Sequence, residues 1–166
     1  MTDIAASLDL RDATLYYYFP SKQALAHECH VRSLSRFERL LREADDAGET
    51  GAAKLDALMR GLLDDSRVNG PQLYFGDHSY LNDDQRAAVD GWAARLTGEL
   101  EQFLRDGIAD GSIVACETGL VVQLLLGMLI WLGKWVPGVE GLTPDRLLAA
   151  MRVFSLEGLR TGKVPA

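Results

Sequence analysis

The stretch "TLYYYFPSK", residues 14–22, places three consecutive tyrosines directly ahead of a helix-start signal. Successive side chains of an α-helix point about 100° apart, so the three rings cannot all face a single core. Leu15 and Phe19 lie four residues apart and form one apolar stripe, which directs Tyr17 to the opposite side of the helix. We therefore predict that at least one tyrosine is exposed and presented to a partner.

The residues on both sides of this stretch predict two short helices followed by a long one. The first short helix ends near Asp9, because Asp tolerates the left-handed backbone that a tight reversal needs. Asp12 is a suitable N-cap for the second helix, over residues 13–19, which Pro20 ends. Ser21 is a good N-cap for the long helix, in which apolar residues recur every three or four positions.

A helix, a tight turn and a second helix with an exposed aromatic face form a candidate helix-turn-helix, the motif that places its second helix in the major groove of DNA. Tyrosine offers a flat apolar face to thymine methyls and a hydroxyl to base edges. The start of the long helix supplies unpaired backbone N–H groups, which can hold a phosphate together with the ammonium of Lys22. The spacing alone leaves one alternative open, a helical hairpin whose tyrosines pack against a partner.

The chain beyond the long helix predicts an all-α fold without a sheet. Few segments alternate polar and apolar residues with period two, whereas Gly, Pro and Asn separate stretches of helical periodicity. Five further helices are predicted, over about residues 52–67, 72–76, 83–110, 116–136 and 144–161.

The net charge of −7 argues against nonspecific binding of nucleic acid over the whole surface. Residues 1–43 hold six basic and six acidic residues, and the remainder holds eleven basic and eighteen acidic residues. The acidic excess therefore belongs to residues 44–166, which indicates two parts with different partners.

Several other kinds of site are not expected. The apolar run at residues 119–133 is shorter than the roughly 20 residues of a membrane span, and the N-terminus lacks an export signal, so we expect a cytoplasmic protein. The histidines of "HECH", residues 27–30, have only His78 and Cys116 as further soft ligands, so no metal site is expected. No phosphate loop or catalytic triad order stands out, and we expect neither an enzyme nor a cofactor.

Residues 3–25, "DIAASLDLRDATLYYYFPSKQAL", resemble the DNA-binding module of TetR-family transcriptional regulators. That family's signature has a D-I-A start, an eight-residue stretch across the turn, then T-L-Y, two aromatic or His positions, F, and P-S-K-E/Q-A-L. The spacing matches without a gap. The resemblance implies that phosphates are contacted by Thr14, Tyr18 and Lys22, and that bases are contacted by Tyr16 and Tyr17.

This module departs from the family's pattern in several places. Asp9 stands where the family usually has Gly, and Arg11 and Asp12 stand where it often has a Ser-Lys pair. An acidic Asp12 near phosphates is unfavourable unless it caps the helix or accepts from a cytosine amino group. The family's module also begins with a further helix ahead of "TDIA". Without that helix, three apolar residues are expected to lose part of their cover: Leu15, Phe19 and Leu25.

The resemblance implies a function and a division of the chain. Residues 1–45 are expected to form the helix-turn-helix module, and residues 46–166 a helical domain for ligand binding and dimerisation. We expect a homodimeric repressor that binds a palindromic operator and releases it when a small apolar or acyl-type effector binds. A second hypothesis stays open, a helical small-molecule-binding dimer without DNA contact.

Aromatic and soft residues are abundant near the helix centres and breaks of the C-terminal part, which predicts an apolar ligand pocket. The segment "WLGKWVPG", residues 131–138, resembles one in TetR-type regulators of lipid and acyl-CoA metabolism, which implies that Lys134 meets an acidic headgroup. The predicted pocket residues are Met59, Leu62, Tyr74, Phe75, Tyr80, Trp92, Phe103 and Met128.

The helices predicted over residues 116–136 and 144–161 are too apolar for two solvent-facing helices. Pairing them with the same helices of a second copy would bury that surface in a four-helix interface. The alternative is that the same residues cover the chain's own core. The predicted interface residues are Leu124, Leu125, Leu132, Leu147, Met151 and Phe154.

Overall fold

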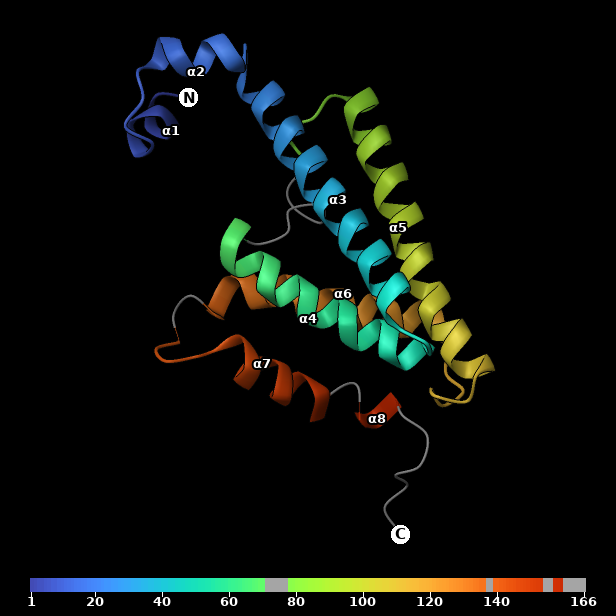
Figure 1. Cartoon of the computed structure of the whole chain (residues 1–166). Helices are drawn as coiled ribbons and strands as arrows, with labels where there is room; N and C mark the ends of the chain where they lie inside the picture. The colour runs from blue at the N-terminus through green and yellow to red at the C-terminus, as the bar shows by residue number, and fades with distance from the viewer. Residues whose placement is uncertain (71–77, 137–138, 154–156, 160–166) are drawn as a thin grey trace.

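The computed structural model describes residues 1–70, 78–136, 139–153 and 157–159. Within these ranges every regular element is a helix, which confirms the predicted all-α class (Figure 1). The helices are α1 (Thr2–Ser7), α2 (Asp12–Tyr18), α3 (Lys22–Ala47), α4 (Gly51–Asn69), α5 (Asp83–Ala109), α6 (Thr118–Trp135), α7 (Pro144–Met151) and α8 (Glu157–Leu159).

The turn between α1 and α2 is closed by a left-handed residue, as predicted. Asp9 has φ of 54°, and the Leu10 N–H donates to the Ala5 carbonyl at 2.9 Å. The Asp9 N–H donates to the Ala6 carbonyl at 3.2 Å, which completes the pair of hydrogen bonds that ends many helices. The first helix therefore ends at a sharp reversal, even though the residue in the left-handed position is not glycine.

The predicted capping role of Asp12 is wrong. Arg11 occupies the N-cap position of α2 without a side-chain hydrogen bond, and Asp12 lies inside the first turn. Its carboxylate oxygen Oδ2 accepts from the Thr2 hydroxyl at 2.7 Å. Asp12 thus ties the second helix to the first, while its negative charge still favours the start of α2.

The long helix α3 joins the helix-turn-helix to the rest of the molecule. Ser21 caps it, because its hydroxyl oxygen accepts from the Ala24 N–H at 3.0 Å, as predicted. The helix has 26 residues and is roughly 39 Å long. In Figure 1, α1 and α2 extend from its first residues, whereas its later turns pack against α4 and α5.

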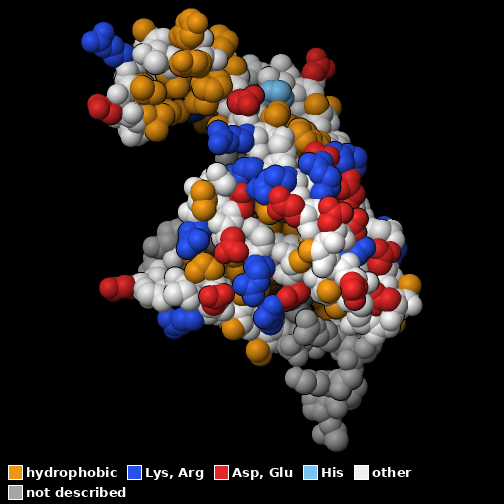
Figure 2. All heavy atoms as spheres, viewed as in Figure 1, with side chains coloured by type: hydrophobic (Ala, Val, Ile, Leu, Met, Phe, Trp, Pro, Cys, Tyr) orange, Lys and Arg blue, Asp and Glu red, His pale blue; other side chains and the backbone are white. Residues whose placement is uncertain are grey.

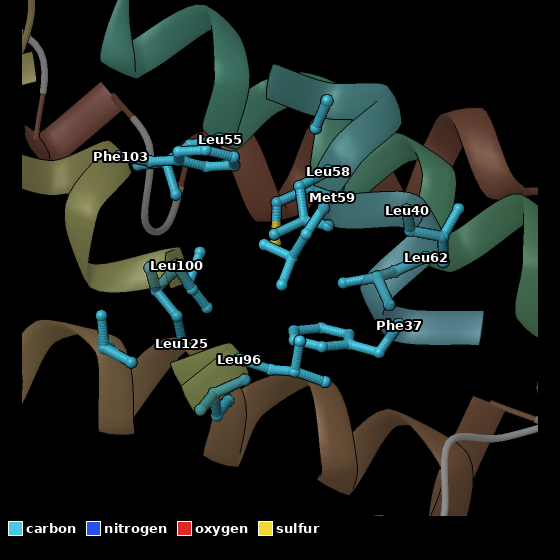
Figure 3. Close-up of a cluster of buried hydrophobic side chains, with 14 of the residues drawn as sticks. Phe37, Leu40, Leu55, Leu58, Met59, Leu62, Leu96, Leu100, Phe103 and Leu125 are labelled. Atoms are coloured by element: carbon cyan, nitrogen blue, oxygen red, sulfur yellow. The ribbon is translucent and has the colours of Figure 1, made fainter. Parts of the chain in front are cut away.

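A leucine-rich core lies between α3, α4, α5 and α6. Phe37 and Leu40 of α3 share one buried cluster with Leu58 and Met59 of α4 (Figure 3). Leu96, Leu100 and Phe103 of α5 and Leu125 of α6 are buried in the same cluster. Burial of one such side chain contributes about 1.5–3 kcal/mol, so this cluster is the main source of stability.

Charged side chains fasten the surrounding helices to this core. Asp65 of α4 is buried and accepts from Arg36 Nε at 2.8 Å and from Arg39 Nη2 at 3.0 Å. The guanidinium of Arg36 also donates to the carbonyls of Asn69 and Gly70, so it satisfies the C-terminal end of α4. These bonds fix α3 and α4 against each other along one edge.

On the other side of α4, α7 is held by two ion pairs. Arg152, directly after α7, donates from Nε to Asp56 Oδ1 at 2.6 Å, and Arg60 lies 3.4 Å from Asp145.

Among the described residues, none of the helices combines the length and the apolar character that a bilayer crossing requires.

The start of α4 lies directly against the backbone of α5. A Cβ atom at Gly51 would lie under 3.0 Å from the backbone of Phe103 and Gly107. The Gly51 N–H donates to Asp110 Oδ2 at 2.8 Å, and the Ala52 N–H donates to Ser112 Oγ at 3.1 Å. Glycine is therefore required at position 51, because any side chain would separate two helices that meet backbone to backbone.

We expect Gly51→Ala to lower the free energy of unfolding by about 1–3 kcal/mol or more, because the added methyl overpacks a rigid contact. The matched control is Gly91→Ala. Gly91 is an exposed position of α5 with nothing within 4 Å of an added Cβ, so alanine should raise stability by about 0.5–1 kcal/mol. Urea denaturation followed by circular dichroism measures both, and equal effects of the two substitutions would contradict the contact.

Candidate nucleic-acid interface and effector-binding core

The three tyrosines of α2 form an exposed aromatic surface. Tyr16, Tyr17 and Tyr18 are 49%, 82% and 68% exposed, whereas Leu15 on the opposite face is 4% exposed. The ring centroids of Tyr17 and Tyr18 lie 5.2 Å apart in an edge-to-face arrangement, which orients both rings. Figure 2 shows hydrophobic side chains gathered over α1 and α2. The prediction that tyrosine is presented outward is confirmed for all three.

The other two predicted DNA contacts flank this surface. Thr14 is exposed near the start of α2, and Lys22 is the first residue of α3. The Ser21 cap satisfies the Ala24 N–H, which leaves the N–H groups of Lys22 and Gln23 without an intrahelical acceptor. The start of α3 can therefore accept an anion, although the ammonium of Lys22 lies over the ring of Tyr80 in this structure.

The first turns of α3 are joined to the start of α5, an arrangement that was not predicted from the sequence. Gln23 Nε2 donates to Gln85 Oε1 at 3.0 Å, and Gln85 also closes a capping box with Asn82 at the start of α5. The N-x-x-Q pattern of that capping box was the available sequence signal for the helix start. Its pairing with Gln23 has no local signature.

His78 and His30 add a second link between α3 and the segment that leads into α5. Their rings meet edge to face with centroids 4.8 Å apart, and His78 Nδ1 lies 3.1 Å from Asp90 Oδ1.

No group of three potential metal ligands occurs in the part of the chain that the structure describes. Cys29 and Cys116 are free thiols.

Five of the eight predicted pocket residues belong to one region, the core between the helices. Met59, Leu62 and Phe103 are buried there, and Trp92 and Met128 are partly buried against it. The Trp92 Nε1 atom is buried and has no hydrogen-bond partner among the described residues. Tyr80 is instead 47% exposed beside α3. Tyr74 and Phe75 lie outside the described residues.

Some of the residues predicted for a dimer interface are buried inside the protomer, and another is exposed on its surface. Four of them are buried inside the protomer, as the alternative interpretation allowed: Leu125, Leu132, Leu147 and Met151. Leu124 is 73% exposed, and Phe154 lies outside the described residues. The outer face of α6 also exposes Leu120 and Trp131, which were not predicted although Leu120, Leu124 and Trp131 recur at helical spacing.

Two family models match the sequence. The model described as "Bacterial regulatory proteins, tetR family" matches residues 1–29, and that described as "Tetracyclin repressor-like, C-terminal domain" matches residues 48–159. A search of curated proteins found no matching sequence.

Solved structures share the fold over nearly the whole chain. The TetR-family transcriptional regulator PfmR from Thermus thermophilus is 22% identical, with a TM-score of 0.81 and coverage of 96% of this chain and 88% of that one. AibR in complex with isovaleryl coenzyme A and operator DNA is 21% identical, with a TM-score of 0.78 and coverage of 93% and 85%. The ketosteroid transcriptional regulator KstR2 of Mycobacterium tuberculosis is 16% identical, with a TM-score of 0.81 and coverage of 97% and 84%.

The resemblance found in the first 25 residues therefore extends over both parts of the chain. The helix-turn-helix matches one model of the family, and a second model covers more than half of the chain. The fold agrees with that of structurally characterised regulators. The protein belongs to the TetR family of bacterial transcriptional regulators.

Proposed function

We propose that this protein is a repressor that binds a palindromic operator as a homodimer and releases it when a small apolar or acyl-type effector binds. Residues 1–45 form the DNA-binding module, and residues 46–166 form the effector and dimerisation domain, with the protein acting in the cytoplasm. The observation that carries the proposal is the exposed tyrosine face of α2, which follows a tight turn within the residues that match the family's DNA-binding model.

In this proposal α2 enters the major groove. Tyr16 and Tyr17 lie against base edges, where an aromatic face meets thymine methyls and a phenol hydroxyl meets hydrogen-bonding groups. Thr14, Tyr18 and Lys22 hold phosphates on either side, together with the unpaired N–H groups at the start of α3. The two tyrosine base contacts therefore come from one turn of α2, and the phosphate contacts come from residues on either side of them.

Asp12 contributes a further base contact in this arrangement. It is exposed in the first turn of α2 and does not cap the helix. The hydroxyl of Thr2 occupies its Oδ2, which holds the carboxylate in place. A carboxylate in the major groove can accept a hydrogen bond from a cytosine amino group. Where no cytosine lies opposite Asp12, the carboxylate repels nearby phosphates and weakens binding.

The effector site lies in the core around Trp92 in this proposal. Trp92 packs against the apolar cluster, and its buried indole N–H offers one donor to a carbonyl or another acceptor of the ligand. The two related regulators named for ligand chemistry, AibR with isovaleryl coenzyme A and the ketosteroid regulator KstR2, support an apolar or acyl-type compound. The side chain of Lys134 lies outside the described residues.

The helix α3 connects the two sites. Its start carries α1 and α2, and its later turns contribute Leu34, Phe37 and Leu41 to the core. An effector that binds the DNA-free geometry better than the DNA-bound one shifts the protein toward release. A tenfold loss of operator affinity requires only about 1.4 kcal/mol of such coupling.

Substitutions in the module should separate base reading from phosphate binding. We expect Tyr17→Ala to cost about 1–3 kcal/mol on the operator and to relax base preference, because it removes a base contact. Lys22→Ala should weaken binding to all sequences alike and reduce the slope of log affinity against log salt by about 0.9. Fluorescence anisotropy with operator and scrambled DNA measures both. Equal operator affinity of Tyr17→Ala and the wild type would refute the assignment.

The dimer prediction uses the outer face of α6. We expect Leu124→Glu to convert the dimer to monomer at low micromolar concentration, because it places a charge in an apolar interface. The fold should be retained, since Leu124 contributes little to the protomer's own core. Val68→Glu is the matched control, because Val68 is similarly exposed but lies on α4. Sedimentation velocity that shows a dimer for Leu124→Glu would exclude this interface.

The effector prediction combines two readouts on one titration. Long-chain acyl-CoA and flat aromatic compounds are added to the operator complex while tryptophan fluorescence and operator release are followed. A true effector should change both over the same concentration range. Trp92→Phe should weaken its binding by about two- to tenfold, as expected for one lost hydrogen bond of about 0.5–1.5 kcal/mol. If no compound of either class changes both signals, this effector class is abandoned.

A further inference from the structure

An aromatic ring of the C-terminal part holds the ammonium of Lys22. The Nζ atom lies 4.2 Å from the ring centroid of Tyr80, within the distance of about 6 Å at which a cation is attracted to a ring face. Lys22 makes no ion pair with a carboxylate anywhere in the described ranges. The ring of Tyr80 is therefore the main attraction that fixes its side chain.

The position of Tyr80 is set by contacts on both sides of it. His78 is anchored to Asp90 at 3.1 Å, and the Asn82–Gln85 capping box fixes the start of α5. Gln85 in turn accepts from Gln23, the residue next to Lys22, at 3.0 Å. These contacts anchor the backbone on both sides of Tyr80 beside the start of α3, where its ring meets the ammonium of Lys22.

The Lys22 side chain points away from the helix that carries the tyrosines. In Figure 1, α1 and α2 leave the start of α3 on one side, and the segment that leads into α5 approaches from the other. In the structure Lys22 is directed to the α5 side. A phosphate beside α2 would attract the same ammonium toward the other side of the start of α3.

We propose that Tyr80 is a positioning residue that competes with operator phosphate for the ammonium of Lys22. The inference rests on the proposed function, in which Lys22 contacts a phosphate. Operator binding then includes the loss of the Lys22–Tyr80 contact, so the ring lowers operator affinity. Tyr80 also belongs to the segment that precedes α5, so any displacement of the start of α5 alters the hold on Lys22. This gives the effector domain a direct influence on one DNA contact.

Substitutions at position 80 test the competition. We expect Tyr80→Leu to tighten operator binding about two- to fivefold, the range that corresponds to an exposed cation–π contact of about 0.5–1 kcal/mol. Tyr80→Phe retains the ring face and should leave the affinity unchanged. Tyr80→Trp presents a stronger ring face and should weaken binding. The salt slope should stay that of the wild type, because the DNA-bound contacts are the same. Weaker binding by Tyr80→Leu, or equal effects of Leu and Phe, would overturn the proposal.

A double-mutant cycle separates competition from an indirect effect of altered structure. In a Lys22→Ala background, Tyr80→Leu should have no effect on operator affinity, because the contested ammonium is gone. A gain of the same size in both backgrounds would mean that Tyr80 acts without Lys22, which contradicts the inference. Lys22→Ala alone tests the underlying DNA assignment, and an unchanged affinity there would overturn the phosphate contact itself. Lys22→Ala therefore tests the proposed phosphate contact, and Tyr80→Leu tests the competition, so the failure of one can be told from the failure of the other.

Discussion

The packing of α3 between α4 and α5 is the constraint on which the rest of the structure depends. Leu34, Phe37 and Leu41 are almost completely buried, so the later turns of this helix cannot rotate or slide without opening the core. The bonds from Arg36 and Arg39 to Asp65 hold its edge against α4. The same helix continues without a break to Lys22, and its orientation in the core therefore determines where the tyrosine surface lies.

The elements with local causes could be predicted from the sequence. The left-handed Asp9, the Ser21 cap and the outward tyrosines each follow from residues within a few positions of one another. The all-α class follows from apolar periodicity, which extends over most of the chain. The role of Asp12 was predicted incorrectly, because its actual partner Thr2 is brought close only by the turn between the two helices.

The remaining features depend on which surfaces meet, and the sequence does not state this. Helix α6 is apolar around most of its circumference, so periodicity cannot decide that Leu125 faces the core and Leu124 faces outward. The predicted pocket included Tyr80 because it is aromatic, but the fold places it beside Lys22 at the surface. Contacts between residues far apart in the chain carry no pattern that a single sequence reveals.

Among the described helices, α1 and α2 share little buried surface with the others. α1 and α2 pack against each other, and each buries one residue, Ala5 and Leu15, outside the main leucine cluster. Few buried contacts mean a small free energy of local opening, so the amide hydrogens of these two helices should exchange with solvent well before those of the core. When DNA binding orders α1 and α2, the binding free energy must offset the conformational entropy that these helices lose. Operator affinity is then set partly by how rigid the reading surface already is before it meets its site.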